Sequence, residues 1–149
     1  MYDEALNYLK QTLGGEADFR DGQWEAIELA MNNNRILIVQ KTGWGKSIVY
    51  FITTKMLRKR NKGPAILISP LLSLVRNQID SATALGIEAG SINSQNFDEW
   101  DEIKHKLKTD TLDILLISPE QLANRDRFTE LLSLTPKGML WPGIERFNQ

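Results

Sequence analysis

The spacing of apolar residues predicts three helices around one short strand in the first third of the chain. Residues 3–13 carry apolar side chains at helical intervals, and Gly14-Gly15 ends that pattern. A second helix is expected after Asp21, whose carboxylate can cap its N-terminus. The apolar run 36–39 has the length of a buried strand, and the third helix would follow it. The core side of the third helix would hold Ile48, Phe51, Ile52 and Met56.

From residue 65 onward the pattern alternates between short apolar runs and amphipathic segments. Strands are expected at 65–69, 86–92 and 112–118, and helices at 71–84 and 97–107. Short strands that are apolar throughout, each separated by a helix, are typical of a parallel sheet covered on both faces. The pattern therefore predicts a doubly wound α/β domain, and 149 residues are enough for one such domain but short for two.

The end of the chain shows no such pattern. The segment 135–149, "TPKGMLWPGIERFNQ", contains two prolines and two glycines and has no convincing period. We therefore expect residues 1–134 to form the folded domain and residues 135–149 to form an irregular C-terminal tail.

Composition excludes several classes of site. The chain has no cysteine and a single histidine, His105, which excludes disulfides, thiolate metal sites and a zinc cluster. No apolar run has the length needed to cross a bilayer, so the sequence predicts a cytoplasmic protein without membrane contact. A net charge of −1 gives no electrostatic argument for nucleic acid at the level of the whole chain.

Basic side chains cluster at the end of the third predicted helix. Cations there complement the helix dipole, so a solvated helix end is the favoured interpretation, with a phosphate-binding patch as the alternative. The cluster consists of Lys55, Arg58, Lys59, Arg60 and Lys62.

The stretch "ILIVQKTGWGKS", residues 36–47, has the order of elements that a phosphate-binding loop requires. An apolar strand enters a loop with Gly43 and Gly45, and a helix is expected to begin near Lys46. Backbone amides and the positive end of the helix would converge on phosphate oxygens, which Gly45 allows to approach closely. Lys46 would neutralise the terminal phosphates. Ser47 would coordinate Mg²⁺ through its hydroxyl.

One observation weighs against this interpretation. Gln40 stands where the pattern G-x-x-x-x-G-K-[ST] has its first glycine. The strict motif is therefore incomplete, although the close approach of the phosphates depends on the later glycines. The alternative is a glycine-bearing turn that leaves an exposed lysine.

Five blocks of sequence together resemble the first RecA-like motor domain of RecQ-type ATP-dependent DNA helicases. In chain order they are "FRDGQWEAI" (19–27), "QKTGWGKSIVYF" (40–51), "AILISPLLSLVRNQI" (65–79), "GIEAGSINS" (86–94) and "DILLISPEQL" (113–122). The resemblance covers residues 5–130 and implies an incomplete P-loop RecA-like fold that binds ATP and Mg²⁺. In such helicases the loop commonly lacks the first glycine, so Gln40 is compatible with a working site.

The resemblance also implies a nucleotide-binding role for individual positions. Gln23 resembles the glutamine that reads adenine through its amide, and Phe19 and Arg20 resemble the residues that flank the base. The bland alternative for Gln23 is a polar residue at an exposed helix start. The loop would contribute Thr42, Gly43, Trp44, Gly45, Lys46 and Ser47, with Lys46 as the catalytic residue.

Trp44 departs from the small residue that is usual in this loop. It would either pack on a neighbouring domain or stack on a base, and packing is the simpler interpretation because it needs no special function.

DNA contacts are implied at the ends of three predicted strands. The segment "SPLLSL" (69–74) resembles the part that touches the DNA backbone in this family, and hydroxyls and amides at a strand end can donate to phosphate. The alternative is that the leucines belong to the core and that turns favour the same polar residue types. The expected residues are Ser69, Pro70, Arg76, Asn77, Asn93, Ser94, Ser118, Pro119 and Glu120.

An acidic motif that the family needs for hydrolysis is absent from the sequence. After the "SPE" block the family has Asp-Glu followed by two residues, of which the second is histidine, to hold Mg²⁺ and activate water. Asp3-Glu4 and Asp101-Glu102 do not follow apolar strands and cannot replace it. A second RecA-like domain, which would supply an arginine finger and would be a partner, is also absent.

The sequence therefore predicts a truncated motor lobe that binds ATP and contacts DNA, either single-stranded or at a duplex junction, with little turnover alone. A non-catalytic interaction or regulatory module derived from a helicase lobe remains the main alternative. A small P-loop kinase or another NTPase is a third, but no acidic residue lies in the required strand context.

Overall fold

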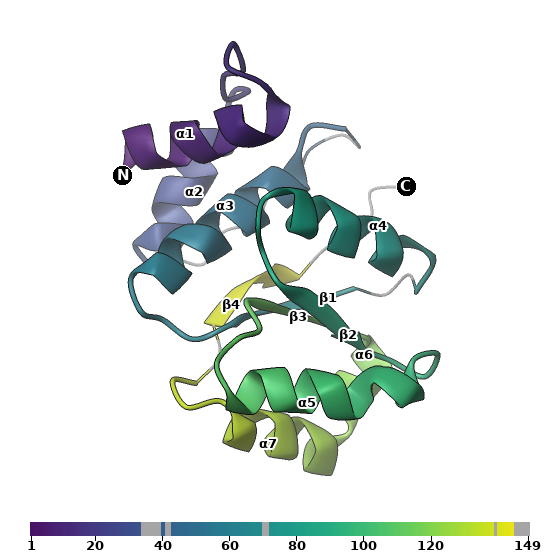
Figure 1. The fold of residues 1–149 in the computed structure, drawn as a ribbon. Coiled ribbons are helices and arrows are strands. Elements are labelled where there is room, and N and C mark those ends of the chain that lie inside the picture. Colours follow the sequence, from purple (N-terminus) through teal and green to yellow (C-terminus); the bar gives the residue numbers. More distant parts are fainter. Residues whose placement is uncertain (34–39, 41–42, 70–71, 139, 145–149) are drawn as a thin grey trace.

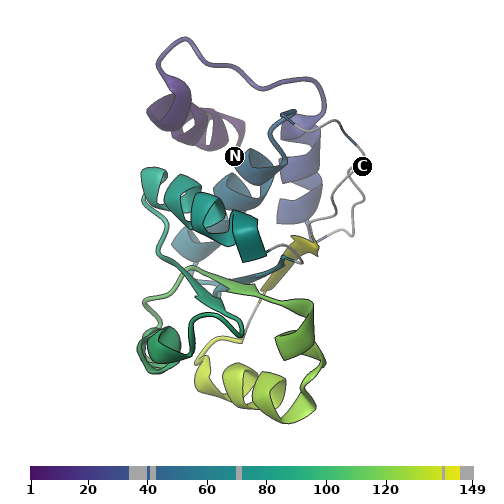
Figure 2. The ribbon, with the colours of Figure 1, turned by 90° about the vertical axis from the view of Figure 1, so that its right-hand side faces the viewer.

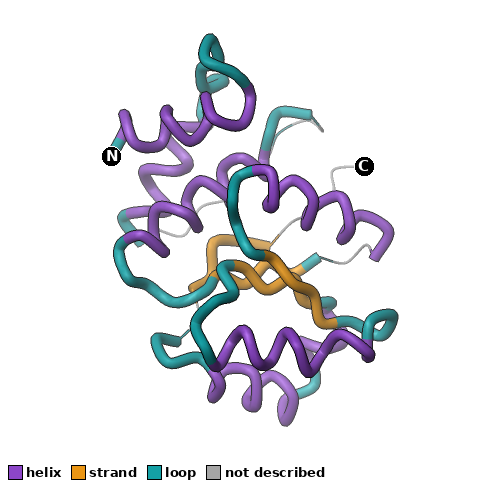
Figure 3. The backbone as a smooth tube through the Cα atoms, in the orientation of Figure 1, coloured by secondary structure: helices purple, strands orange, loops and turns teal. Residues whose placement is uncertain are grey.

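The computed structural model describes residues 1–33, 40, 43–69, 72–138 and 140–144, the last of these as backbone only. Its described strands form one sheet in the order β2-β3-β1-β4, in which every pairing is parallel (Figures 1 and 3). The strands are β1 (Ala65–Ile68), β2 (Ala89–Ile92), β3 (Ile114–Ile117) and β4 (Leu140–Ile144). Helices cover both faces of this sheet, so the predicted doubly wound α/β architecture is confirmed.

The two central strands are buried on both sides because their residues alternate between two apolar clusters. Ala65 and Leu67 of β1 face the first cluster, whereas Ile66 and Ile68 face the second. The residues of β3 divide in the same way, with Ile114 and Leu116 on one side and Leu115 and Ile117 on the other. This two-sided burial explains why the sequence of each strand is apolar throughout and does not alternate.

The helices that precede β2 lie on the side of the first cluster (Figure 2). α3 (Lys46–Lys59) and α4 (Leu72–Ala84) pack directly on the sheet through Tyr50, Phe51, Val75 and Ala82. α1 (Tyr2–Leu13) and α2 (Gln23–Met31) form an outer layer over α3 and share a third cluster with it. In that cluster Leu9 and Ile27 meet Ile52 and Met56, so α3 is held from both sides.

The opposite face of the sheet is covered by the elements between β2 and β4. These are the 3-10 helix η1 (Phe97–Glu99), α5 (Trp100–Lys108), the short α6 (Pro119–Ala123) and α7 (Arg125–Leu134). Trp100, Ile103, Leu107 and Leu131 are the buried residues that these helices contribute to the second cluster. His105 is exposed on α5, as expected for a solvated helix face.

The remaining elements agree with the sequence pattern except at three places. Asp21 does not cap α2, because Gly22 is the N-cap residue, in a left-handed conformation and without a side-chain cap. The helices α6 and α7 were not expected, since "SPE" was interpreted only as a strand end with polar ligands. The expected strand at 36–39 lies outside the described residues.

The third difference is the C-terminal segment. Residues 140–144 are not irregular: they form β4 and pair with β1 in parallel, with Ala65 opposite Leu140 and Ile68 opposite Ile144. The register shifts between Ala65 and Leu67, so that β4 advances three residues where β1 advances two. Pro142 lacks a backbone N–H and lies within this shift. Because proline and glycine interrupt the run of apolar residues, the sequence of this segment shows no strand period, and the strand was not predicted.

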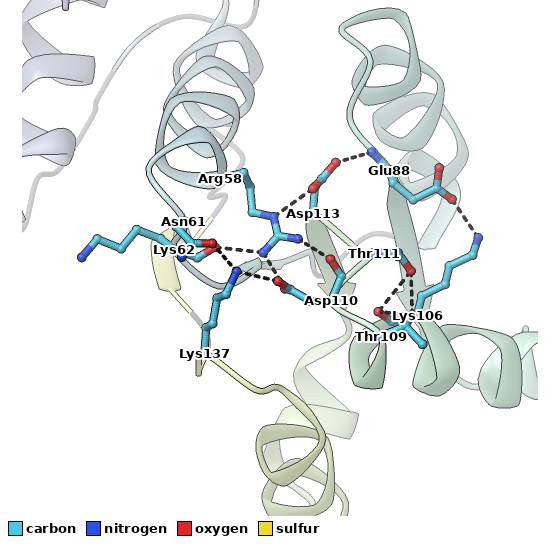
Figure 4. A network of polar contacts seen from close by, with 10 residues as sticks. All are labelled: Arg58, Asn61, Lys62, Glu88, Lys106, Thr109, Asp110, Thr111, Asp113 and Lys137. Carbon is cyan, nitrogen blue, oxygen red and sulfur yellow. Dashed lines mark hydrogen bonds and ion pairs between the residues drawn. The ribbon is translucent and has the colours of Figure 1, made fainter.

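Arg58, near the end of α3, joins segments that are distant in sequence (Figure 4). Its Nε donates to Asp113 Oδ1 over 2.9 Å, and Nη1 donates to Asp110 Oδ1 over 2.8 Å. The carbonyl oxygens of Lys62 and Asp110 accept two further bonds, of 2.9 and 2.8 Å. Lys137 adds an ion pair to Asp110 Oδ2 at 2.9 Å and so ties the segment before β4 to the same point.

The charges in this network reinforce one another. Although partial burial opposes it, hydrogen bonds from Lys137 and Arg58 lower the pKa of Asp110 below its usual value. Burial likewise acts to lower the pKa of Arg58, but the two aspartates outweigh it and raise that pKa. Two of the cations in the cluster that ends α3 are thus used in ion pairs: Arg58 pairs with Asp110, and Arg60 pairs with Glu4.

Candidate nucleotide-binding site

The loop before α3 has the backbone conformation that a phosphate site needs. α3 begins at Lys46 and its N-cap, Gly45, is left-handed at φ 96° and ψ 42°. Gly43 also has a positive φ, of 91°. Residues that carry a side chain rarely adopt such φ angles, so both positions require glycine for the backbone to follow this path. The N-terminus of a 14-residue helix carries free amides and a partial positive charge, and these favour an anion.

Lys46 and Ser47 occupy the first turn of α3 with their polar ends available. Both residues are half-buried. Neither side chain takes part in a hydrogen bond or ion pair with the residues that the structure describes, whereas most cations near the other end of α3 do. An ammonium and a hydroxyl that have no partner among the described residues, beside the amides of a helix N-terminus, fit a polyphosphate and its magnesium ion. Thr42, expected to belong to this loop, lies outside the described residues.

The segment 19–23, expected to contact the base, is bonded directly to the loop. Gln23 Nε2 donates to the carbonyl oxygens of Trp44, over 3.0 Å, and Gly45, over 3.3 Å. Gln23 Oε1 accepts the backbone N–H of Arg20 at 2.8 Å, and Arg20 Nη1 donates to the carbonyl oxygen of Gly43. Gln23 is 4% exposed, so it is not the exposed helix-start residue of the alternative interpretation. Reading a base would require its amide to leave these carbonyls.

Gly45 and Gln23 are in close contact. A Cβ atom built on Gly45 would lie 2.4 Å from Gln23 Nε2, closer than a Cβ atom can normally approach another heavy atom. Position 45 therefore requires glycine, both for its left-handed conformation and for this close approach. A Cβ atom on Gly43, by contrast, would meet no atom within 4 Å among the described residues.

Aromatic residues surround this segment. Phe19 is half-buried and its ring centroid lies 6.0 Å from that of Tyr2 and 6.3 Å from that of Trp24. Trp44 is half-buried against the cluster shared by α1, α2 and α3, and its Nε1 donates to the carbonyl oxygen of Asp21 over 3.0 Å. Trp44 therefore packs within its own domain, whereas the sequence suggested a neighbouring domain as the surface for packing.

The polar residues expected at strand ends do gather at one edge of the sheet. Ile68, Ile92 and Ile117 are paired in register at the carboxyl ends of β1, β2 and β3. Ser69, Asn93 and Ser118, which follow them, therefore lie beside one another at that edge. Ligands of open α/β sheets commonly bind there.

Several of these side chains are already used by the local structure. Asn93 Oδ1 accepts the N–H of Gln95 at 2.8 Å and so closes a turn. Ser118 is the N-cap of α6, and its hydroxyl accepts from Gln121. The hydroxyl of Ser69 is buried and has no partner in the part of the chain that the structure describes. Exposed side chains near this edge are those of Arg76, Asn77, Ser94, Pro119 and Glu120; Pro70 lies outside the described residues.

Two features of the site were missed in the sequence. The carbonyl oxygen of Asp21 receives the Trp44 indole, a backbone acceptor that no residue pattern reveals. The second feature lies in the turn after β2. There Asn96 Nδ2 donates to the carbonyl oxygen of Ser91 over 2.6 Å, and Trp100 Nε1 donates to Asn96 Oδ1 over 2.9 Å. The spacing of four between Asn96 and Trp100, one helical turn, was the available signal.

Comparisons with known proteins agree with this description. The family model for DEAD/DEAH box helicases matches residues 20–135. The ATP-dependent DNA helicases RecQ of Haemophilus influenzae and Bacillus subtilis are each 38% identical to the chain, over 130 and 126 residues. These matches cover 87% and 83% of this chain and 20% of each relative. The chain thus spans about a fifth of the length of these relatives.

A parallel sheet between two helical layers, with a glycine loop opening a long helix, defines the class as α/β with an incomplete RecA-like fold. The chain belongs to the DEAD/DEAH box helicase family, in which it is RecQ-like. Among the described residues, no helix has the length and apolar character to cross a membrane.

Proposed function

We propose that the chain is the ATP-binding motor lobe of a RecQ-like DNA helicase, and that it binds Mg-ATP through residues 43–47. The observation that supports this most strongly is the free N-terminus of α3, where the side chains of Lys46 and Ser47 have no partner among the described residues. The amides of this turn would bind the phosphates. Lys46 would neutralise the terminal phosphates and Ser47 would be a ligand of Mg²⁺.

The base of ATP would lie against the segment 19–23. Phe19 and Arg20 would flank it, and the amide of Gln23 would accept from the exocyclic amine and donate to a ring nitrogen. For this, Gln23 must exchange its bonds to the carbonyls of Trp44 and Gly45 for bonds to adenine. The exchange replaces two hydrogen bonds with two others, so its net cost is small.

Single-stranded DNA would lie along the carboxyl edge of the sheet. Arg76, Asn77 and Ser94 are exposed there and can donate to backbone phosphates, with Pro119 beside them. Glu120 brings a negative charge to the same edge and would oppose binding. Asn93, Ser118 and the buried Ser69 would need to leave their present arrangement to reach DNA, so we expect weak and salt-sensitive affinity.

Hydrolysis and unwinding would require groups beyond those of this chain. β4 is the strand after the "SPE" block, but the residues that follow it in the sequence are Glu145-Arg146, not the acidic motif. Another acidic pair, Asp98-Glu99, lies exposed in η1, away from the loop before α3. We therefore propose slow turnover in the isolated chain, with a second RecA-like domain as partner. Because ATP and DNA must both reach the site, the proposal keeps the cytoplasmic location expected from the sequence.

Replacement of Lys46 by alanine tests the proposal. Loss of one charged partner of the phosphates costs about 1.5–3 kcal/mol, so the variant is expected to bind Mg-ATP roughly 10- to 100-fold more weakly. Titration with a fluorescent ATP analogue measures this. Lys62→Ala, which removes an exposed lysine beyond the other end of α3, is the matched control and should bind as the unmodified chain does.

Equal affinities in the unmodified chain and in Lys46→Ala would remove the site from the loop. If the unmodified chain bound no nucleotide but captured another protein, the non-catalytic interaction module would be the better account of its function.

A further inference from the structure

Two segments that lie more than twenty residues apart meet at the nucleotide site through side chains from both. From the segment 19–23, Arg20 and Gln23 donate to carbonyl oxygens of the loop. In the reverse direction there is a bond from Trp44, whose Nε1 donates to the carbonyl oxygen of Asp21 at 3.0 Å. Trp44, which lies in the loop, therefore contacts the segment 19–23, the side of the site where the base would bind.

The ring of Trp44 also packs over the turn that begins α2. A Cβ atom built on Gly22 would lie 3.5 Å from Trp44 Cζ2, an ordinary van der Waals contact. Gly22 has φ +88° and is the N-cap of α2, so the indole covers the point where the segment 19–23 enters that helix. One hydrogen bond thus joins this turn to the phosphate loop, and the indole ring lies close beside Gly22.

Arg20 and Gln23 differ from Trp44 in what happens when a nucleotide binds. In the proposed function the amide of Gln23 leaves the loop carbonyls to contact adenine, and Arg20 turns to flank the base. The bond from Trp44 uses a backbone carbonyl that the base does not need. It can therefore persist while the other contacts exchange.

We propose that Trp44 is a positioning residue that fixes the distance between the base-side segment 19–23 and the phosphate loop. This rests on the proposed function, in which one ligand spans both segments. A ligand with a base at one end and phosphates at the other binds more tightly when both half-sites are already held in place, because no free energy is lost in ordering them. A polyphosphate without a base contacts the loop alone and gains nothing from this link.

The test compares two ligands on the full chain and on Trp44→Phe, which keeps an aromatic ring but removes the indole N–H. Calorimetric titrations with Mg-ATP and with magnesium tripolyphosphate give the four affinities. We expect Mg-ATP to bind about fivefold more weakly to the variant, which corresponds to ~1 kcal/mol, the typical net worth of one hydrogen bond. Tripolyphosphate should change by less than about twofold.

Trp24→Phe is the matched control, because it makes the same chemical change in the same cluster of α1, α2 and α3. The ratio of the two affinities should not change in that variant. Tripolyphosphate binding by Trp44→Phe also reports that the loop is folded.

Each other outcome is decisive. If Trp44→Phe lost both ligands equally, or neither, Trp44 would be a structural residue and the inference would be overturned. If the unmodified chain bound no Mg-ATP, the proposed function itself would fail, and that failure is visible before any variant is made.

Discussion

Replacing Gly45 with alanine is expected to weaken Mg-ATP binding at least tenfold. Gly45 has φ +96°, and the left-handed conformation costs a residue with a side chain about 1–2 kcal/mol. The new methyl group would also lie 2.4 Å from Gln23 Nε2, so the glutamine must withdraw from the carbonyls of Trp44 and Gly45. Either adjustment moves the loop amides away from a common centre. Titration with a fluorescent ATP analogue measures the loss.

Gly43→Ala separates the two causes. Gly43 has a similar positive φ, of 91°, but a Cβ atom there would have no neighbour within 4 Å in the part of the chain that the structure describes. It should therefore lose less affinity than Gly45→Ala, since only the backbone is strained. Gly15→Ala, in an exposed turn with open space and without a positive φ, should have no effect on binding. Equal binding by Gly45→Ala and the unmodified chain would contradict the loop geometry.

Replacing Arg58 with alanine is expected to lower the free energy of unfolding by roughly 2–3 kcal/mol. The side chain is 14% exposed and neutralises Asp110 and Asp113, which would remain partly buried without it. Removing one partner of a buried ion pair costs about 3–5 kcal/mol, and partial exposure of these carboxylates reduces that figure. The change also frees the carbonyl oxygens of Lys62 and Asp110. Urea unfolding followed by circular dichroism measures the difference.

Arg60→Ala is the control for this prediction. Arg60 lies two residues further on and pairs with Glu4, but the two side chains are 37% and 32% exposed. An exposed pair contributes about 0–1 kcal/mol, so this variant should be nearly as stable as the unmodified chain. If Arg58→Ala were no less stable than Arg60→Ala, the Arg58 network would not be what joins α3 to the entry of β3.

The fold was predictable where periodicity and burial act together. β1 and β3 are apolar throughout because two helical layers cover them, and the sequence pattern expresses that directly. β4 was not predictable in this way. Its pairing depends on the edge of β1 and on a shifted register around Pro142, which are properties of the partner strand.

The site was predictable in its residue types but not in their contacts. The order of strand, glycine loop and helix indicated Lys46 and Ser47, and the structure places both in the first turn of α3. The bond from Trp44 to the carbonyl oxygen of Asp21 could not be inferred, because a backbone acceptor has no residue signature. The ion pairs of Arg58 likewise join residues more than fifty positions apart, and no local pattern encodes them.

The central claim is that the backbone amides of residues 43–47 form the phosphate site, and nuclear magnetic resonance of the ¹⁵N-labelled chain tests it most directly. Addition of Mg-ATP is predicted to shift the amide signals of Gly43, Gly45, Lys46 and Ser47, while those of α5 stay unchanged. Saturation without shifts in residues 43–47, or shifts confined to another part of the chain, would contradict the account.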